Sequence, residues 1–233
     1  MLPWIVLPTY NEAENLALLV GELQRIVEAN FVIVDDHSPD GTGAIADQLA
    51  EHNQRMVVLH RSGKLGLGSA YQEGFRLALT HGATIVVQMD ADGSHDPKLL
   101  PALLHQAESH DMVIASRYIR GGSFPIVWYR RWISMVGNYY IRLLLGWSIR
   151  DWSTGYKVWQ GGFLQRVMTV PSNGVGYAWL IEMTWITRKL QGRIIEVPMR
   201  FQERRSGQSK FSWRIATEDI LVAWKLFWRR SNL

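Results

Sequence analysis

Residues 84–97 read TIVVQMDADGSHDP, and this stretch joins an expected core strand to a pair of acids. The run Thr84–Met89 is apolar, as expected of a buried strand. Two carboxylates follow it, Asp90 and Asp92, one residue apart and on the same side of an extended segment. They repel each other there, so a positive group is expected beside them. Two hard oxygen donors at this spacing suit a divalent cation such as Mg²⁺, which takes one or two carboxylates plus substrate phosphates.

Short apolar runs alternate with helical patterns throughout the N-terminal half. Strands are predicted at Trp4–Leu7, Phe31–Val34, Met56–Leu59, Thr84–Met89 and Met112–Ala115, and helices near 12–29, 42–53, 68–81 and 97–108. This alternation is typical of a parallel sheet with crossover helices. Polar clusters end three of the strands: PTYNE (8–12), VDDHSPDG (34–41) and MDADGSHDP (89–97). Ligands bind beyond the carboxyl ends of the strands in open α/β sheets, so we expect the site at this edge.

Several other classes of protein are disfavoured. A dinucleotide-binding protein would carry a glycine fingerprint after its first strand, where this chain has PTYNE. The later GLGSAY (66–71) lacks the fingerprint spacing and predicts a turn and a helix start. The absence of cysteine excludes disulfides, thiolate metal sites and thiol nucleophiles. We expect no signal peptide, because no basic, apolar and cleavage-site pattern is seen before the first apolar run. We expect no transmembrane helix, because the most apolar later stretch, 126–147, is broken by three arginines.

Charge and tryptophan are divided unevenly along the 233 residues, which we expect to form a single domain (1–233). Residues 1–116 hold 6 Lys/Arg and 15 Asp/Glu, a net charge of −9, whereas residues 117–233 hold 19 and 6, a net charge of +13. Ten of the 11 tryptophans lie at or after Trp128. Tryptophan beside arginine is typical of surfaces that meet anionic lipid headgroups. A basic surface over a tryptophan-rich core fits the composition equally well.

The C-terminal half predicts two amphipathic helices, over 126–147 and from residue 213 onward. Three polar residues recur on one face of the first helix, at i, i+4 and i+8: Arg130, Ser134 and Asn138. Gly192–Gln202 resembles a strand at the edge of a sheet, because its proline cannot donate to a ladder. Amphipathic helices of this kind can lie in a membrane interface without crossing it.

Seven motifs, taken in order, resemble the inverting family-two glycosyltransferases of the GT-A fold, and more narrowly the dolichol- or polyprenol-phosphate mannosyltransferases. They are PTYNE, VDDHSPDGT, KLGLGSAYQEG, MDADGSHDP, ASRY, DWSTGYK and RRSGQSKF, and together they cover almost the whole chain. The resemblance implies an α/β, Rossmann-like, mostly parallel sheet flanked by helices, with C-terminal amphipathic interfacial helices. It implies a nucleotide-sugar-binding half (1–116) and an acceptor-binding, membrane-interface half (117–233). It also implies a cytoplasmic enzyme, peripheral on the cytoplasmic face of a membrane.

The resemblance assigns roles motif by motif. The donor, GDP-mannose, would be held by Pro8, Tyr10, Glu12, Val34, Asp36, Asp90, Ala91, Asp92, Arg117, Arg204 and Lys210. The acceptor, dolichyl or polyprenyl phosphate, would contact Arg130, Ser134 and Arg204. Asp90, Asp92 and Arg117 would serve catalysis, and Mg²⁺ or Mn²⁺ would be held by Asp90, Asp92 and Ser94. Some members place glutamine where Ser94 stands, so the third ligand is either this serine or water.

The implied reaction is attack of the lipid phosphate on the anomeric carbon of mannose, with inversion and release of GDP. A phosphate monoester, with a second pKa of about 6, is already anionic at neutral pH and needs no general base. A UDP-glucose-dependent polyprenyl-phosphate glucosyltransferase stays an alternative, because no residue selects mannose over glucose. A non-enzymatic module binding nucleic acid or headgroups is a second alternative, disfavoured by the acidic strand ends, and no nucleic-acid partner is expected. Whether a separate membrane protein anchors the chain is left open.

Overall fold

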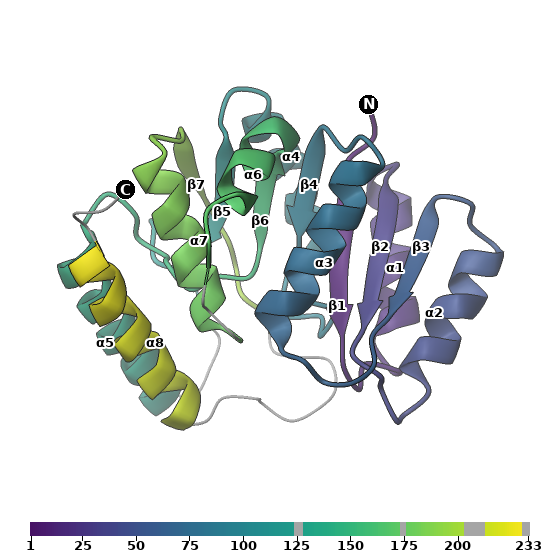
Figure 1. Ribbon diagram of the computed structural model, residues 1–233, viewed down its shortest axis with the longest axis horizontal. Coiled ribbons are helices and arrows are strands. Elements are labelled where there is room, and N and C mark those ends of the chain that lie inside the picture. The colour runs from purple at the N-terminus through teal and green to yellow at the C-terminus, as the bar shows by residue number, and fades with distance from the viewer. Residues whose placement is uncertain (124–127, 173–175, 203–212, 230–233) are drawn as a thin grey trace.

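The computed structural model describes residues 1–123, 128–172, 176–202 and 213–229, with the backbone alone at 129–130 and 213–219 (Figure 1). Seven strands form one sheet in the order β3-β2-β1-β4-β6-β5-β7. Their bounds are β1 Trp4–Thr9, β2 Asn30–Asp35, β3 Met56–His60, β4 Ile85–Gln88, β5 Met112–Ser116, β6 Lys157–Gln160 and β7 Ile194–Pro198. Only β6 runs antiparallel to its neighbours, β4 and β5, so the described sheet is mostly parallel.

Helices cover both faces of this sheet. Their bounds are α1 Leu16–Ile26, α2 Thr42–Glu51, α3 Leu67–Thr80, a 3₁₀ turn Pro97–Leu99, α4 Leu100–Ala107, α5 Trp128–Leu145, α6 Gly161–Met168, α7 Ala178–Lys189 and α8 Trp213–Trp228. One core cluster packs α3, α6 and α7 on one face, and a second packs α1, α2 and α4 on the other. In Figure 1, α3, α6 and α7 lie in front of the strands, and α1 lies behind them. Burial on both faces explains why β1, β2 and β5 are nearly continuous apolar runs.

Helices α5 and α8 lie side by side at the end of the molecule next to β7 (Figure 1). Each presents buried side chains to the core, such as Ile141 of α5 and Leu226 of α8. Each also exposes large aromatic side chains, for example Trp132 at 62% and Trp228 at 66%. None of the described helices is both long enough and apolar enough to cross a membrane.

The five predicted N-terminal strands and four predicted helices are confirmed, although α1 begins at Leu16 instead of residue 12. The edge strand predicted within Gly192–Gln202 is also confirmed, as β7 at the sheet edge. The sequence analysis missed β6, which is four residues long and lies between β4 and β5. Its KVWQ run is too short to show a period of its own.

Candidate active site

The expected strand-end clusters come together at one edge of the sheet. Because β2, β1, β4 and β5 are parallel, the residues that follow them all emerge on the same side. Four charged groups lie near the buried ring of His95, because the charge of each one affects the pKa of that ring. They are Asp90, Asp92, Arg117 and Asp151. The acids after β4 and the arginine after β5 therefore belong to one site.

Asp90 and Asp92 are held by different parts of the chain. The Tyr71 hydroxyl, from α3, donates to Oδ1 of Asp90 at 2.6 Å. The backbone N–H of Ser94 donates to Oδ1 of Asp92 at 3.0 Å. Asp92 is buried, with 7% of its surface exposed, whereas the Asp90 side chain is 21% exposed. The two carboxylates are thus oriented before any ligand arrives.

His95 fixes the main chain at Asp90. The backbone N–H of Asp90 donates to Nδ1 of His95 at 3.1 Å, so the proton of the neutral ring lies on Nε2. Burial lowers the pKa of His95, against the opposing charges of Asp90 and Asp92, which favours this neutral form. The ring stacks on Tyr156 with centroids 5.1 Å apart. His95 is therefore a buried, packed ring that also holds the backbone of Asp90 in place.

The first two strand ends carry the residues that the sequence analysis expects on the nucleotide side of the site. Pro8 and Val34 are register partners on β1 and β2. Beyond β1, the side chain of Lys64 lies over the Tyr10 ring, 4.0 Å from its centroid. Glu12 is buried, and its carboxylate accepts a hydrogen bond from the Asn15 amide at 2.8 Å.

Asp36 forms a buried ion pair with Arg61, which follows β3. Burial raises the pKa of Asp36, and the guanidinium of Arg61 partly offsets this by favouring the charged carboxylate. Arg61 also donates to the Ser69 hydroxyl at 2.7 Å, which ties the start of α3 to the same group. The loop after β2 is therefore anchored to two neighbouring segments.

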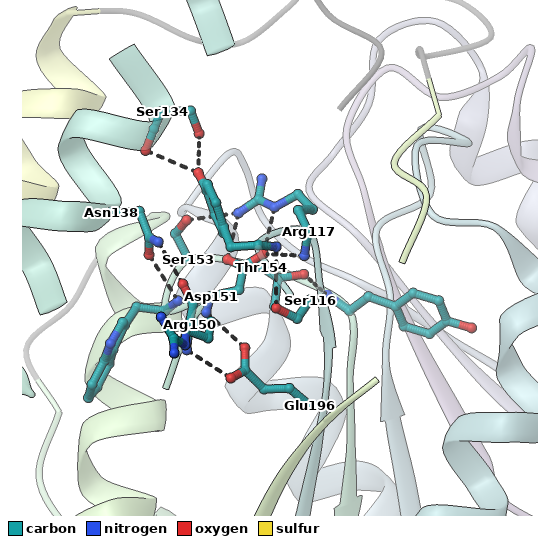
Figure 2. A network of polar contacts seen from close by, with 12 residues as sticks. Ser116, Arg117, Ser134, Asn138, Arg150, Asp151, Ser153, Thr154 and Glu196 are labelled. Atoms are coloured by element: carbon teal, nitrogen blue, oxygen red, sulfur yellow. Dashed lines mark hydrogen bonds and ion pairs between the residues drawn. The ribbon is translucent and has the colours of Figure 1, made fainter. Parts of the chain in front are cut away.

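Arg117, directly after β5, is bound by Asp151 in a two-pronged ion pair (Figure 2). Its Nε and Nη2 donate to the two Asp151 oxygens at 2.7 and 2.8 Å, and its backbone N–H donates at 3.0 Å. Nη2 also donates to the Ser153 hydroxyl at 3.0 Å. Asp151 is fully buried and raises the pKa of Arg117, so the guanidinium stays charged in spite of its own burial.

Helix α5 is connected to this ion pair at two points (Figure 2). The Tyr118 hydroxyl lies 2.7 Å from the Ser134 hydroxyl. The Asn138 amide donates to the carbonyl of Arg150 at 2.6 Å, on one side of Asp151. On the opposite side, the Glu196 carboxylate of β7 accepts from the backbone N–H groups of Arg150 and Asp151 at 2.8 and 2.9 Å. The loop that carries Asp151 is held by both elements.

A pocket of about 230 Å³ opens between the segment after β5 and α5. Its lining includes Arg117, Tyr118, Ser123, Arg131 and Met135. The sequence analysis chose Arg130 for the acceptor, but the side chain of Arg130 lies outside the described residues, as do Arg204 and Lys210 entirely. The neighbouring Arg131 is the basic residue of α5 that this pocket places near Arg117.

The paired acids fit a divalent cation in their chemistry. Asp90 and Asp92 offer hard carboxylate oxygens beyond β4, and Ser94 is buried beside them. Within the described ranges, no group of three or more His, Asp or Glu residues is arranged to hold a metal ion. Two carboxylates completed by substrate phosphate oxygens suit Mg²⁺, so a third acidic ligand is not required.

Several residues of the site were missed by the sequence analysis. They are Arg61, Tyr71, Asn138 as a contact of the 150–152 loop, Asp151 and Glu196. Tyr71 and Asp151 stand within two quoted motifs, KLGLGSAYQEG and DWSTGYK. These motifs gave the available signal, but neither shows which side chain its residues face.

Comparisons with known proteins identify the family. The family model described as "Glycosyl transferase family 2" matches residues 4–165. An undecaprenyl-phosphate mannosyltransferase of Micrococcus luteus is 42% identical over 219 residues, 93% of this chain and 90% of the relative. A polyprenol monophosphomannose synthase of Mycolicibacterium smegmatis is 41% identical over 214 residues, 89% of this chain and 80% of the relative.

Solved structures show the same fold at low identity. Mannosyl-3-phosphoglycerate synthase of Rubrobacter xylanophilus aligns with a TM-score of 0.75 at 17% identity, over 100% of this chain and 76% of the other. A mannosyltransferase of Pyrobaculum calidifontis, in complex with GDP-Man and Mn²⁺, aligns with a TM-score of 0.63 at 17% identity, over 97% of this chain and 64% of the other. The family match, together with the relatives from Micrococcus luteus and Mycolicibacterium smegmatis, shows that the chain belongs to glycosyl transferase family 2 and is a glycosyltransferase.

Proposed function

We propose that this enzyme transfers mannose from GDP-mannose to a polyprenyl or dolichyl phosphate, with inversion at the anomeric carbon and release of GDP. The observation that carries the proposal is the 42% identity, over 93% of the chain, to an undecaprenyl-phosphate mannosyltransferase. The arrangement of carboxylates beyond β2 and β4 and of an arginine beyond β5 supports it. The site accordingly has an acidic side for the donor and a basic side for the acceptor.

The donor is proposed to lie over the ends of β1, β2 and β4. Pro8, Tyr10, Glu12, Val34 and Asp36 would contact the guanosine part, and Asp90, Ala91 and Asp92 would face the diphosphate. The likeness in fold to a mannosyltransferase solved with GDP-Man and Mn²⁺ is consistent with this placement. Mg²⁺ or Mn²⁺, held by Asp90 and Asp92 with Ser94 or water, would neutralise charge on the departing diphosphate.

Arg117 is proposed to contact phosphate oxygens at the reacting centre. Its ion pair with Asp151 fixes the plane of the guanidinium, a group well suited to phosphate recognition. Arg130 and Ser134, with Arg204 and Lys210 from the RRSGQSKF motif, stay predicted ligands. An acceptor phosphate that is already anionic attacks without a general base, so alignment and charge balance are the main requirements.

The acceptor's isoprenoid tail requires the site to reach a bilayer surface, and we place that surface at α5 and α8. Large hydrophobic side chains exposed among the described residues gather there. They are Trp128, Trp132, Met135, Val136, Tyr139, Leu143, Trp147, Ile220, Leu221, Trp224 and Trp228. Elsewhere in the described chain, the only exposed large hydrophobic side chains are those of Met1, Leu18 and Leu65. Amphipathic helices with aromatic residues are suited to an interfacial position without spanning, so we propose peripheral attachment to the cytoplasmic face.

The decisive assay incubates purified protein with radiolabelled GDP-mannose, Mg²⁺ and undecaprenyl phosphate, and counts label extractable into organic solvent. Label should enter the organic phase only when lipid phosphate is present, and excess unlabelled UDP-glucose should not reduce it. EDTA should stop the transfer, and Mn²⁺ or Mg²⁺ should restore it. Extractable label that arises from UDP-glucose and not from GDP-mannose would contradict the proposed donor and favour a glucosyltransferase.

The membrane surface is tested by sedimentation with vesicles of phosphatidylcholine and phosphatidylglycerol. Trp132→Ser with Trp224→Ser should release the protein from the vesicles. Leu18→Ser with Leu65→Ser, at residues that are 58% and 52% exposed away from the two helices, should not. Arg229 is a poor choice for charge reversal, because it pairs with Glu182 at 3.4 Å and such a change would disturb packing. Equal binding by the two double variants would refute this surface.

A further inference from the structure

The hydroxyl of Tyr71 is the feature that the proposed function does not use. Tyr71 lies on α3, is fully buried, and stacks on Trp179 with centroids 5.7 Å apart and planes 9° apart. Packing alone would be served by a phenylalanine, as at Phe75 one turn later on the same helix. The Tyr71 hydroxyl instead extends to Oδ1 of Asp90, at 2.6 Å. A short bond from a neutral O–H to a carboxylate is among the stronger hydrogen bonds in proteins.

The rest of the surroundings of Asp90 restrict the same carboxylate. The backbone of Asp90 is held by Nδ1 of His95, and Nε2 of that ring lies 3.9 Å from Oδ2, beyond hydrogen-bond range. Gly155 approaches from a third direction, since a Cβ there would lie 2.8 Å from Oδ2. Asp90 therefore has one oxygen bound by Tyr71 and the other in close contact with a glycine, with a fixed main chain beneath.

We propose that Tyr71 is a positioning residue that orients the carboxylate of Asp90 toward the divalent cation and diphosphate of the donor. The inference rests on the proposed function, because it assigns Asp90 to that ligand. Tyr71 uses one lone pair of Oδ1 of Asp90, which leaves Oδ2 for the cation. Asp92 is taken as the main ligand of the cation from the motif resemblance. Side chains that orient metal ligands typically change metal affinity 10- to 100-fold when they are removed.

The test compares two variants that each remove one hydroxyl from a fully buried ring. Tyr71→Phe removes the hydroxyl that binds Asp90, and Tyr156→Phe removes a buried hydroxyl with no hydrogen-bond partner within the described chain. Binding of Mn²⁺ in the presence of GDP is measured by calorimetry, alongside the melting temperature and the steady-state constants. We expect Tyr71→Phe to weaken Mn²⁺ binding about 10-fold. Its melting temperature and its KM for lipid phosphate should change little, and excess Mn²⁺ should restore its kcat.

Tyr156→Phe should match the unaltered protein in Mn²⁺ affinity and kcat. A double-mutant cycle then asks whether Tyr71 acts through Asp90. In the Asp90→Asn background, Tyr71→Phe should cause no further loss of Mn²⁺ affinity. A loss of the same size in both backgrounds would overturn the inference.

Two other outcomes also decide against it: an unchanged Mn²⁺ affinity in Tyr71→Phe, or loss of the folded state in that variant, which would make the hydroxyl a support of the fold. Failure of the proposed function looks different. In that case the unaltered protein itself would not bind Mn²⁺ and GDP together, and Tyr71→Phe would have no affinity to change.

Discussion

Two buried ion pairs, one on each side of the sheet edge, present opposite charges toward the site. On the nucleotide side, Asp36 is 7% exposed and its partner Arg61 is 2% exposed. On the other side, Arg117 is 12% exposed and its partner Asp151 is fully buried. In each pair the more deeply buried group orients the one nearer to the surface. Under the proposed function, this difference would let one edge offer a carboxylate to the nucleotide and a guanidinium to a phosphate.

The same contrast runs through the whole chain. Residues 1–116 carry a net charge of −9 and supply the acids after β2 and β4, while residues 117–233 carry +13 and supply Arg117 and α5. A carboxylate near phosphate is unfavourable without a cation, and clustered arginines are unfavourable without anions. The proposed reaction brings a cation to one side and a phosphate to the other, which would balance both.

The largest effect is expected from removing an acid on the donor side. Asp92→Ala should reduce transfer of mannose below detection, because the main ligand of the cation is lost. The melting temperature should stay near that of the unaltered protein, because Asp92 lies in a loop beyond β4. Label transfer and circular dichroism on the same preparation check this. Substantial transfer by a folded Asp92→Ala protein would break the contrast between an acidic donor side and a basic acceptor side.

The second-largest effect on activity is expected from Asp151, the buried partner of Arg117 on the basic side. Asp151→Asn removes the charge that fixes Arg117 but keeps a side chain of the same shape. We expect kcat to fall about 100-fold, since small misplacements of a reacting group can cost this much. GDP affinity, measured by calorimetry, should stay within about 2-fold because the nucleotide side is intact. A GDP affinity that falls in parallel with kcat would show that Asp151 is not specific to one side.

The buried partner on the acidic side should give the reverse pattern. Arg61→Met leaves Asp36 without its cation, and burial already raises the pKa of that acid. We expect about a 10-fold weaker GDP affinity, with smaller changes in the KM for lipid phosphate. Calorimetry with GDP and steady-state kinetics with both substrates separate the two effects. An unaltered GDP affinity would mean that Asp36 does not contact the nucleotide.

A smaller effect is expected where α5 meets the loop of Asp151. Asn138→Ala removes the amide that donates to Arg150, so the KM for lipid phosphate should rise several-fold and that for GDP-mannose should stay constant. Asn53→Ala is the control, because it removes an asparagine whose side chain accepts a hydrogen bond from the backbone N–H of Arg55, before β3 and at the opposite end of that strand from the site. Equal changes in the two Michaelis constants of Asn138→Ala would contradict the proposed link between α5 and Arg117.

The least effect on activity is expected at Lys157, a basic residue that lies in the core. Burial lowers the pKa of Lys157 to about 7, and its ammonium donates to Leu180 and Thr184 at 2.8 Å. Between about pH 7 and 10 the unfolded chain binds the extra proton, so this group makes folding more favourable as pH rises. Chemical denaturation at pH 7 and pH 9 should show this gain, and Lys157→Met should abolish it. An equal gain in the variant would refute the lowered pKa.

Much of the fold was predictable because apolar runs and helical periods alternate regularly up to residue 116. The predicted strand ends also located Pro8, Tyr10, Asp36, Asp90 and Arg117 at one edge, since parallel strands share that edge. Two residues of the predicted polar face of α5, Ser134 and Asn138, both bond to the body of the protein, and the side chain of the third, Arg130, lies outside the described residues.

The contacts that orient the site could not be predicted. Tyr71 is 19 residues from Asp90 and Asp151 is 34 from Arg117, and nothing local in the sequence pairs them. The antiparallel β6, which positions the loop of Asp151, was missed for the same reason. Its four residues gain their strand conformation from β4 and β5 on either side.

We propose that Asp90 and Asp92 share a divalent cation with the diphosphate of the nucleotide. A crystal structure of the protein with GDP and Mn²⁺, with anomalous scattering used to locate the metal, would reveal or exclude this arrangement. We predict an anomalous peak that marks a Mn²⁺ ion bound to Asp92, beside Asp90, and to the diphosphate of GDP. A nucleotide bound elsewhere, or one bound over β1 and β2 with no metal at these two acids, would contradict the account.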